Sequence, residues 1–348
     1  MKKLVVFALL SSFILFAGTV FASEYKGNPI SAKFATEEIE GEMMTVFAHK
    51  FADDMKSWSD GKINIDIFPY GSLGGTRDIA ESAQLGVIEY VFTDSAWISS
   101  LVPEAQTLAL HFLFPREKGP ETLAWVVKNG SFMPALEKAF RRSGLVPLGA
   151  MWEGWQWITS KDPINTMADL KGVKLRLMGS KVLMDQWRAY GAAPTPMSFG
   201  EIYGGLQMGL IDAQMQPLFG NYGMKFYEVT DFQTAIYAEA FIGIPSMNAK
   251  AYDSLPPNVQ QKVRQWWADA AIPAAKWLED RTARDKASIE KDRPVVKFTE
   301  LSDDKIEEFR KIGKANYSNL MKHLGKDGQK VLDALEKDIA NAQKALGN

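Results

Sequence analysis

The sequence has no cysteine and only three histidines among its 348 residues. Without cysteine the chain can form no disulfide, no thiolate metal site and no cysteine nucleophile. It carries 40 basic and 42 acidic residues, a formal net charge of −2. It therefore lacks the basic surplus of nucleic-acid-binding proteins, and we expect no nucleic-acid partner. With 46% hydrophobic residues, the chain is long enough to be stabilised by its cores alone.

Motifs of the common enzyme classes are also absent. There is no glycine-rich dinucleotide- or phosphate-binding loop, no Gly-x-Ser-x-Gly and no His-Glu-x-x-His. His49, His111 and His323 belong to no recognisable constellation, and His111, between two apolar residues, is expected in the core. The acidic run at 37–42 lacks the alternating Asp/Asn pattern of a calcium loop. We therefore expect no enzymatic activity, no metal and no cofactor.

The N-terminus has the pattern of an export signal. Lys2 and Lys3 precede an apolar run at residues 4–16, and Val20-Phe21-Ala22 offers small residues at the usual cleavage positions. The apolar run is too short for a comfortable membrane span. Cleavage near Ala22 would make residues 1–22 a signal peptide and place the protein in the periplasm. The alternative is an uncleaved membrane anchor.

Hydrophobic periodicity predicts an α/β protein with a mostly parallel sheet covered by helices. In the first unit we expect strands at 31–36, 62–68 and 90–93 and helices at 42–59 and 77–85. A second unit begins near Trp152, with a strand at 173–177, helices at 181–190 and 199–208, and no flexible linker before it. The long helical pattern at 256–292 contains Pro273, which should kink or divide that helix. Further helices are expected at 305–346.

Several motifs share their order and spacing with a known family. They are INTMADLKGVKLR at 164–176, GAAPTP at 191–196, EIYGGLQMGLIDAQMQP at 201–217, IFPYGSLGG at 67–75, LGVIE at 85–89 and FYEV at 226–229. Together they resemble the extracytoplasmic solute receptors of TRAP transporters (DctP type), and the resemblance covers most of residues 31–300. It implies a two-lobe fold like that of periplasmic binding proteins, with a long helix spanning both lobes. Lobe I would comprise 23–153 plus 242–281, and lobe II 154–241 plus 282–348 with the C-terminal helices.

The resemblance also implies a function. Such receptors capture a small organic anion and deliver it to the small and large membrane subunits of a sodium-driven permease, and we expect a monomer. The solute itself is not named by the sequence: a monocarboxylate, a hydroxy, keto or aromatic acid, or a small sulfonate would fit. The alternatives are a periplasmic enzyme using cleft carboxylates as acid and base, and a signalling receptor without transport. Neighbouring genes for membrane subunits would favour transport, and a neighbouring sensor kinase would favour signalling.

Four candidate ligand-binding residues follow from the family pattern. Arg176 stands where the family places the arginine that grips the anion, although an arginine at a strand end can simply pair with a surface carboxylate. Gln216 replaces an asparagine common in relatives, and Phe199 matches a ligand-facing aromatic ring that could equally belong to a core. Gln156 falls where sialic-acid-binding members carry a second arginine. A neutral amide there implies a solute with less charge.

Four further candidates rest on position. Glu37 and Asp94 follow predicted strands, where ligands of open α/β sheets bind, and align with ligand-contacting residues of relatives. For the acidic run that includes Glu37, the alternative is a solvated helix start. Three tryptophans within residues 152–157 cannot all face one core from a strand. Trp152, which shares the parity of Gln156, and Trp97 are therefore cleft candidates, with core packing as the alternative.

Overall fold

The structure is a computed structural model that describes residues 25–347. The predicted export signal and its cleavage site lie outside the described residues. Within residues 25–347, no helix combines the length and apolarity needed to cross a membrane.

The N-terminal half of the described chain begins with the predicted βαβαβ unit. Its elements are β1 (Ile30–Thr36), α1 (Met43–Trp58), β2 (Ile63–Phe68), α2 (Thr76–Leu85) and β3 (Tyr90–Asp94). Helix α1 forms because Met43, Phe47, Phe51 and Met55 recur every four residues and are all buried on one face. Strand β1 pairs in parallel with β2 and β3. The unit continues with α3 (Ser95–Ile98), η1 (Pro103–Ala109), α4 (Gly119–Asn129), α5 (Phe132–Arg142) and β4 (Leu145–Pro147).

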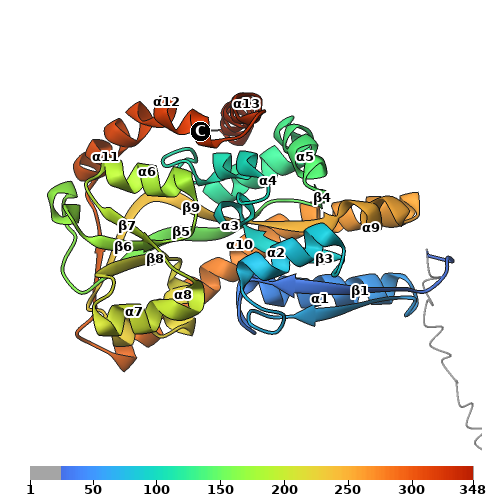
Figure 1. The fold of residues 1–348 in the computed structure, drawn as a ribbon, viewed down its shortest axis with the longest axis horizontal. Helices are drawn as coiled ribbons and strands as arrows, with labels where there is room; N and C mark the ends of the chain where they lie inside the picture. The colour runs from blue at the N-terminus through green and yellow to red at the C-terminus, as the bar shows by residue number, and fades with distance from the viewer. Residues whose placement is uncertain (1–24, 348) are drawn as a thin grey trace, which may run out of the picture.

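A second α/β unit follows, and its inner strands are also parallel to one another. It contains β5 (Met151–Ser160), η2 (Met167–Leu170), β6 (Lys174–Leu177), α6 (Lys181–Ala189), β7 (Ala193–Pro196), η3 (Phe199–Glu201), α7 (Ile202–Met208), β8 (Ala213–Gln216), α8 (Leu218–Gly223) and η4 (Phe226–Glu228). Strand β6 pairs in parallel with β7 and β8. We call the side of the molecule with β1, β2 and β3 lobe I, and the side with β6, β7 and β8 lobe II (Figure 1).

Strand β9 (Phe232–Asn248) joins the two lobes. In the described residues the sheet order is β2-β1-β3-β9-β5-β8-β6-β7, with β4 and β10 (Lys297–Glu300) also paired to β9. The pairs β3–β9, β9–β5 and β5–β8 are antiparallel, so the direction changes where the lobes meet. Strand β5 shifts register against β9 between Trp152 and Trp157, next to Gly154 at φ +103°. The predicted fold class is confirmed, and the chain crosses between lobes through strands. The residue boundaries assigned to the lobes stay a prediction.

Helix α10 (Pro257–Asp292) is the predicted long helix, and it packs against α1 and α4 as well as α8. The expectation that Pro273 would divide it is wrong, because one helix of 36 residues continues through the proline. Proline removes one backbone donor, and the packing of α10 against both lobes holds the rest of the helix together. Helices α9 (Ala249–Ser254), α11 (Asp303–Ala315), α12 (Tyr317–Leu320), η5 (Met321–His323) and α13 (Gly328–Leu346) complete the described chain.

Candidate functional site

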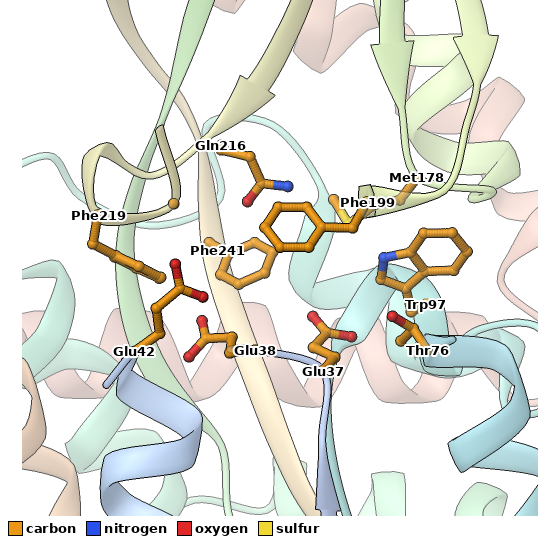
Figure 2. A pocket seen from close by; sticks show the side chains of 11 residues that line it. Glu37, Glu38, Glu42, Thr76, Trp97, Met178, Phe199, Gln216, Phe219 and Phe241 are labelled. Atoms are coloured by element: carbon orange, nitrogen blue, oxygen red, sulfur yellow. The ribbon is translucent and has the colours of Figure 1, made fainter. Parts of the chain in front are cut away.

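A cavity lies between the two lobes, at the carboxyl ends of β1 and β8. Figure 2 shows glutamates on one side, and Gln216 and aromatic rings facing them from the other lobe. The space is about 20 Å³, room for about one water molecule. A solute of several heavy atoms therefore needs the lobes to separate before it can enter. The lining residues are Glu37, Glu38, Glu42, Thr76, Trp97, Met178, Phe199, Gln216, Phe219, Gly220 and Phe241.

The glutamates come from the turn between β1 and α1. Glu37, Glu38 and Glu42 are only 6%, 4% and 1% exposed, whereas the Glu40 side chain is 65% exposed. The interpretation of this run as a solvated helix start is therefore wrong for the three buried glutamates and correct for Glu40. Packing of lobe II over this turn is what removes the three carboxyl groups from water.

Backbone groups hold two of these carboxyl groups in place. Glu38 Oε2 accepts from the Met44 amide at 2.5 Å, and Glu42 Oε2 accepts from the Ile39 amide at 3.3 Å. Their other oxygens, Glu38 Oε1 and Glu42 Oε1, are buried and have no hydrogen-bond partner among the described residues. The same is true of Glu37 Oε2. One oxygen of Glu38 and of Glu42 is thus anchored and the other is available to a ligand.

Burial disfavours the charged form of each carboxyl group. It raises the pKa of Glu38 to about 7. Burial also raises the pKa of Glu37 and Glu42 well above the usual glutamate range, and neighbouring carboxylates raise it further. Glu153, from β5, lies directly behind Glu38, and its carboxyl group packs against Gly243, where any side chain would collide with it. Burial raises the pKa of Glu153 well above the usual glutamate range, and the nearby charge of Glu38 raises it further. With their pKa values raised in this way, part of this cluster is protonated near neutral pH.

Arg176 lies on β6, two residues before the cavity-lining Met178. Its guanidinium is fully buried, and Nε donates to the Met197 carbonyl at 2.9 Å. Nη1 and Nη2 have no hydrogen-bond partner among the described residues. Burial lowers the pKa of Arg176 to about 10, opposed by the charges of Glu37 and Asp94. The group therefore stays charged and presents two unused donors, in a lobe facing the carboxyl groups.

Asp94 and Trp97 form one local unit at the end of β3. Asp94 Oδ1 accepts from the amides of Ala96 and Trp97, at 2.8 and 3.1 Å, and so caps α3. Burial raises the pKa of Asp94 to about 7. Trp97 lines the cavity. Asp94 is outside the cavity lining, and its visible role is to position the short helix that carries Trp97.

Phe199 and Gln216 come from lobe II, and both line the cavity. The Phe199 ring makes edge-to-face contacts with Tyr70 and Phe226, with centroids 5.6 and 6.1 Å apart. It therefore has both roles that the sequence left open, as a member of a small apolar cluster and as part of the cavity wall. Gln216 ends β8, and Figure 2 shows its amide above the cavity between Phe219 and Phe199.

Gln156 and Trp152 lie away from the cavity lining. Trp152 packs against Phe114 and Trp155, with ring centroids 5.7 and 5.0 Å apart. The register shifts of β5 between these positions break the parity that linked Trp152 to Gln156. Gln156 is buried, and its amide oxygen and nitrogen have no hydrogen-bond partner in the described chain.

Behind Gln156 lies a second buried acidic group, Glu239 of β9. Burial raises the pKa of Glu239 to about 8. His111 Nε2 is 3.5 Å from Glu239 Oε2, and His111 Nδ1 is 3.0 Å from the Tyr190 hydroxyl. Burial lowers the pKa of His111 to about 3, so its ring is neutral. His111 is thus the core histidine that its apolar neighbours predict.

Sequence reasoning missed several cavity residues. Phe219 and Gly220 follow the motif that ends at residue 217, and their position next to it was the available signal. Phe241 lies on the crossing strand β9, and Glu153, which lies behind the lining residue Glu38, is on the crossing strand β5. No local pattern distinguishes a residue that faces the cavity on such strands, because both faces are covered.

The chemistry that this site supports is recognition. Within residues 25–347, no group of three or more histidine, aspartate or glutamate side chains is arranged to hold a metal ion. The site offers paired N–H donors on one lobe, carboxyl acceptors on the other and aromatic surface between them. These are the elements of a pocket that binds a small polar solute.

The fold and the cavity define the class: a two-lobe α/β protein of the periplasmic-binding-protein type, with a cavity between its lobes. The chain belongs to the bacterial extracellular solute-binding protein family 7 (DctP), whose family model matches residues 34–324. The resemblance seen in the sequence is therefore confirmed, and the family is one of solute-binding proteins.

Individual relatives agree with this assignment. The chain is 30% identical over 325 residues to the ectoine/5-hydroxyectoine-binding periplasmic protein UehA of Ruegeria pomeroyi, covering 93% of this chain and 95% of the relative. The structure is similar to the periplasmic ectoine-binding protein of the TeaABC TRAP transporter of Halomonas elongata, with a TM-score of 0.84 and 28% identity, covering 89% and 99% of the two chains. A TRAP periplasmic solute-binding protein of Desulfovibrio salexigens with bound orotic acid gives a TM-score of 0.83 at 27% identity, covering 90% and 99%.

Proposed function

We propose that this receptor captures a small organic acid through Arg176 and delivers it to the membrane subunits of a TRAP transporter. The observation that carries the proposal is the buried Arg176 guanidinium, whose Nη1 and Nη2 have no partner among the described residues. Leaving such donors unpaired inside a protein is costly. A carboxylate or sulfonate in a bidentate contact satisfies both.

The guanidinium is also positioned for this task. The hydrogen bond from Nε to the Met197 carbonyl fixes the plane of the guanidinium group. Strand β6 holds this group near the carboxyl ends of the strands, where solutes bind in open α/β sheets. The names of two relatives mention ectoine and the bound solute of another is orotic acid. Both compounds are small rings with one carboxyl group. An acid of this size would fit between Phe199, Phe219 and Trp97 once the lobes have moved apart to admit it.

Binding would proceed by closure of the lobes. A solute entering the open cleft contacts Arg176 from lobe II and the glutamates from lobe I, so its contacts are complete only in the closed form. That differential affinity shifts the population toward closure. The closed receptor is then the form that the membrane subunits recognise. The periplasmic enzyme and the signalling receptor remain the competing functions.

A thermal-shift screen across organic acids tests the binding step. A ligand at one hundred times its dissociation constant stabilises the folded state by about 2.7 kcal/mol, and the shift should vanish in Arg176→Gln. Uptake by vesicles containing the membrane subunits should then require the receptor. Recovery of chemically altered solute would favour the enzyme, and uptake that is independent of the receptor would contradict the transport function.

A further inference from the structure

The two lobes touch beside the cavity through Tyr70. This residue follows β2 of lobe I, and its hydroxyl accepts a hydrogen bond from the Gly200 amide of lobe II at 3.2 Å. Its ring meets the Phe199 ring edge to face, with centroids 5.6 Å apart. Phe199 lines the cavity, whereas Tyr70 is outside the cavity lining. The contact therefore joins the lobes next to the place of the solute and not within it.

The loop that carries Tyr70 is fixed to lobe I by its backbone. The Tyr70 amide donates to the Glu38 carbonyl at 2.9 Å, and the Ser72 amide donates to the Pro69 carbonyl at 3.0 Å. Between them Gly71 has φ +84°, a conformation that favours glycine. The Tyr70 side chain is thus directed by a tight turn and moves together with lobe I.

On the other lobe, the Gly200 amide needs an acceptor from outside its own helix. Gly200 is the second residue of η3, and the first amides of a helix have no acceptor within it. The Ser198 amide is satisfied locally by Glu201 Oε2 at 3.2 Å, but the Gly200 amide uses Tyr70. A β-carbon at residue 200 would lie 3.3 Å from the Tyr70 hydroxyl. Glycine therefore leaves the room in which the hydroxyl reaches the amide.

Phe199 connects this contact to the cavity wall. Its ring lies between Tyr70 of lobe I and Phe226 of lobe II, which it meets edge to face with centroids 6.1 Å apart. Edge-to-face pairs prefer a defined geometry, so both lobes together orient the ring. When the lobes separate, Phe199 loses the partner from lobe I and the Gly200 amide loses its acceptor.

We propose that Tyr70 is a latch between the lobes. It stabilises the closed receptor through contacts that need no solute, and it positions Phe199 without touching the solute itself. That closure serves binding rests on the proposed function. The apparent dissociation constant varies inversely with the fraction of receptor in the binding-competent form. A latch therefore changes the affinity for every solute by the same factor, whereas a direct contact favours one solute over another.

Tyr70→Phe tests the latch because it removes the hydroxyl and keeps the ring. Loss of one hydrogen bond should lower the ratio of closed to open receptor by about two- to tenfold. Because the chain has no cysteine, spin labels attach only at introduced positions. Ser57→Cys on α1 and Gln207→Cys on α7 are both exposed and lie on different lobes. Pulsed electron paramagnetic resonance on the full mature receptor then measures the separation of the lobes with no solute added.

Tyr203→Phe is the matched control. Tyr203 packs against the same apolar cluster as Tyr70, but its hydroxyl donates to Glu228 Oε2 within lobe II, at 3.0 Å. The two variants therefore make the same chemical change in the same cluster, and only Tyr70→Phe removes a bond between the lobes. Tyr203→Phe should keep the wild-type ratio of closed to open receptor.

Calorimetry with several acids from the thermal-shift screen gives the second measurement. Tyr70→Phe should weaken all of them by one common factor, of up to about ten, and Tyr203→Phe should weaken none. Factors that differ between solutes would make Tyr70 a solute contact and overturn the latch. The latch is also overturned when Tyr70→Phe matches Tyr203→Phe in both measurements, and the Arg176 anchor then still stands. When no acid binds, the proposed function fails, and the separation of the lobes alone decides whether Tyr70 is a latch.

Discussion

Replacing Arg176 by alanine removes the one group that the proposed function depends on most. In the ligand-free receptor its guanidinium makes one hydrogen bond, from Nε to the Met197 carbonyl, and leaves Nη1 and Nη2 unpaired. In the complex, both nitrogens would donate to the solute's carboxylate in a space that excludes water. The variant therefore loses two charge-assisted hydrogen bonds and leaves the solute's anion without a partner.

The expected cost of Arg176→Ala is about 2–5 kcal/mol, a loss of affinity of roughly thirtyfold to several thousandfold. Arg176→Lys keeps the charge but has no planar fork, so it should recover only part of this loss. Both variants should fold, because the guanidinium's unpaired donors contribute nothing to the cores. Glu37 and Asp94 lose a neighbouring cation, and protonation of their carboxyl groups offsets that loss.

Binding calorimetry with the tightest organic acid from the thermal-shift screen measures the effect, and circular dichroism confirms folding. Arg188→Ala is the matched control, since Arg188 lies in the same lobe but is half-exposed and pairs with Asp185. It should bind like wild type. A folded Arg176→Ala variant that binds within a few-fold of wild type would refute the anchor.

Three further predictions concern selectivity, pH and export. Because Arg176 is the one buried arginine near the cavity in the described chain, solutes with one anionic group should bind better than dicarboxylates of similar size. Calorimetry with matched pairs tests this, and tighter binding of the dicarboxylates would contradict it. In the folded protein Glu38 and Asp94 have pKa values of about 7, so their carboxyl groups keep their protons almost to neutral pH. In the unfolded chain the same two groups lose their protons at lower pH. The free energy of unfolding should therefore fall from about pH 6.5 to about pH 8, by up to about 1.4 kcal/mol per pH unit for each carboxyl group that is still protonated. Neutral His111 opposes this trend only below its ordinary pKa of 6.5; urea unfolding that shows constant or rising stability would contradict the expectation. Mass spectrometry of native periplasmic protein should find an N-terminus at or near Ser23, and an intact Met1 on membrane-bound material would oppose cleavage.

The fold could be predicted largely from local patterns. The four-residue spacing from Met43 to Met55 places α1 within a residue of its observed bounds, and the alternation at 62–68 does the same for β2. Helix α10 was predicted at nearly its full length, but its continuity through Pro273 was not. A proline weakens a helix locally, and only the packing of α10 against both lobes decides that the helix continues.

The site could be predicted in part. The family motif pointed to Arg176, Phe199 and Gln216, and the last two line the cavity. Trp152 was expected near the cleft from strand parity, and the register shifts of β5 place it against Phe114 instead. A period of two holds only while a strand is regular, and Gly154, an isolated glycine inside this strand, was the available signal of the bulge.

By itself, the sequence determined the family, the order of the elements and the presence of an arginine at the end of β6. It also placed an acidic run after the first strand, but it did not distinguish a buried glutamate from a solvated one. Only the tertiary structure decided that Glu37, Glu38 and Glu42 are buried while Glu40 faces water. It also brought Glu153 and Phe241 to the same place from crossing strands. The physical reason is that burial and charge environment are sums over contacts between segments far apart in the chain, and such sums leave no local pattern in the residues that make them.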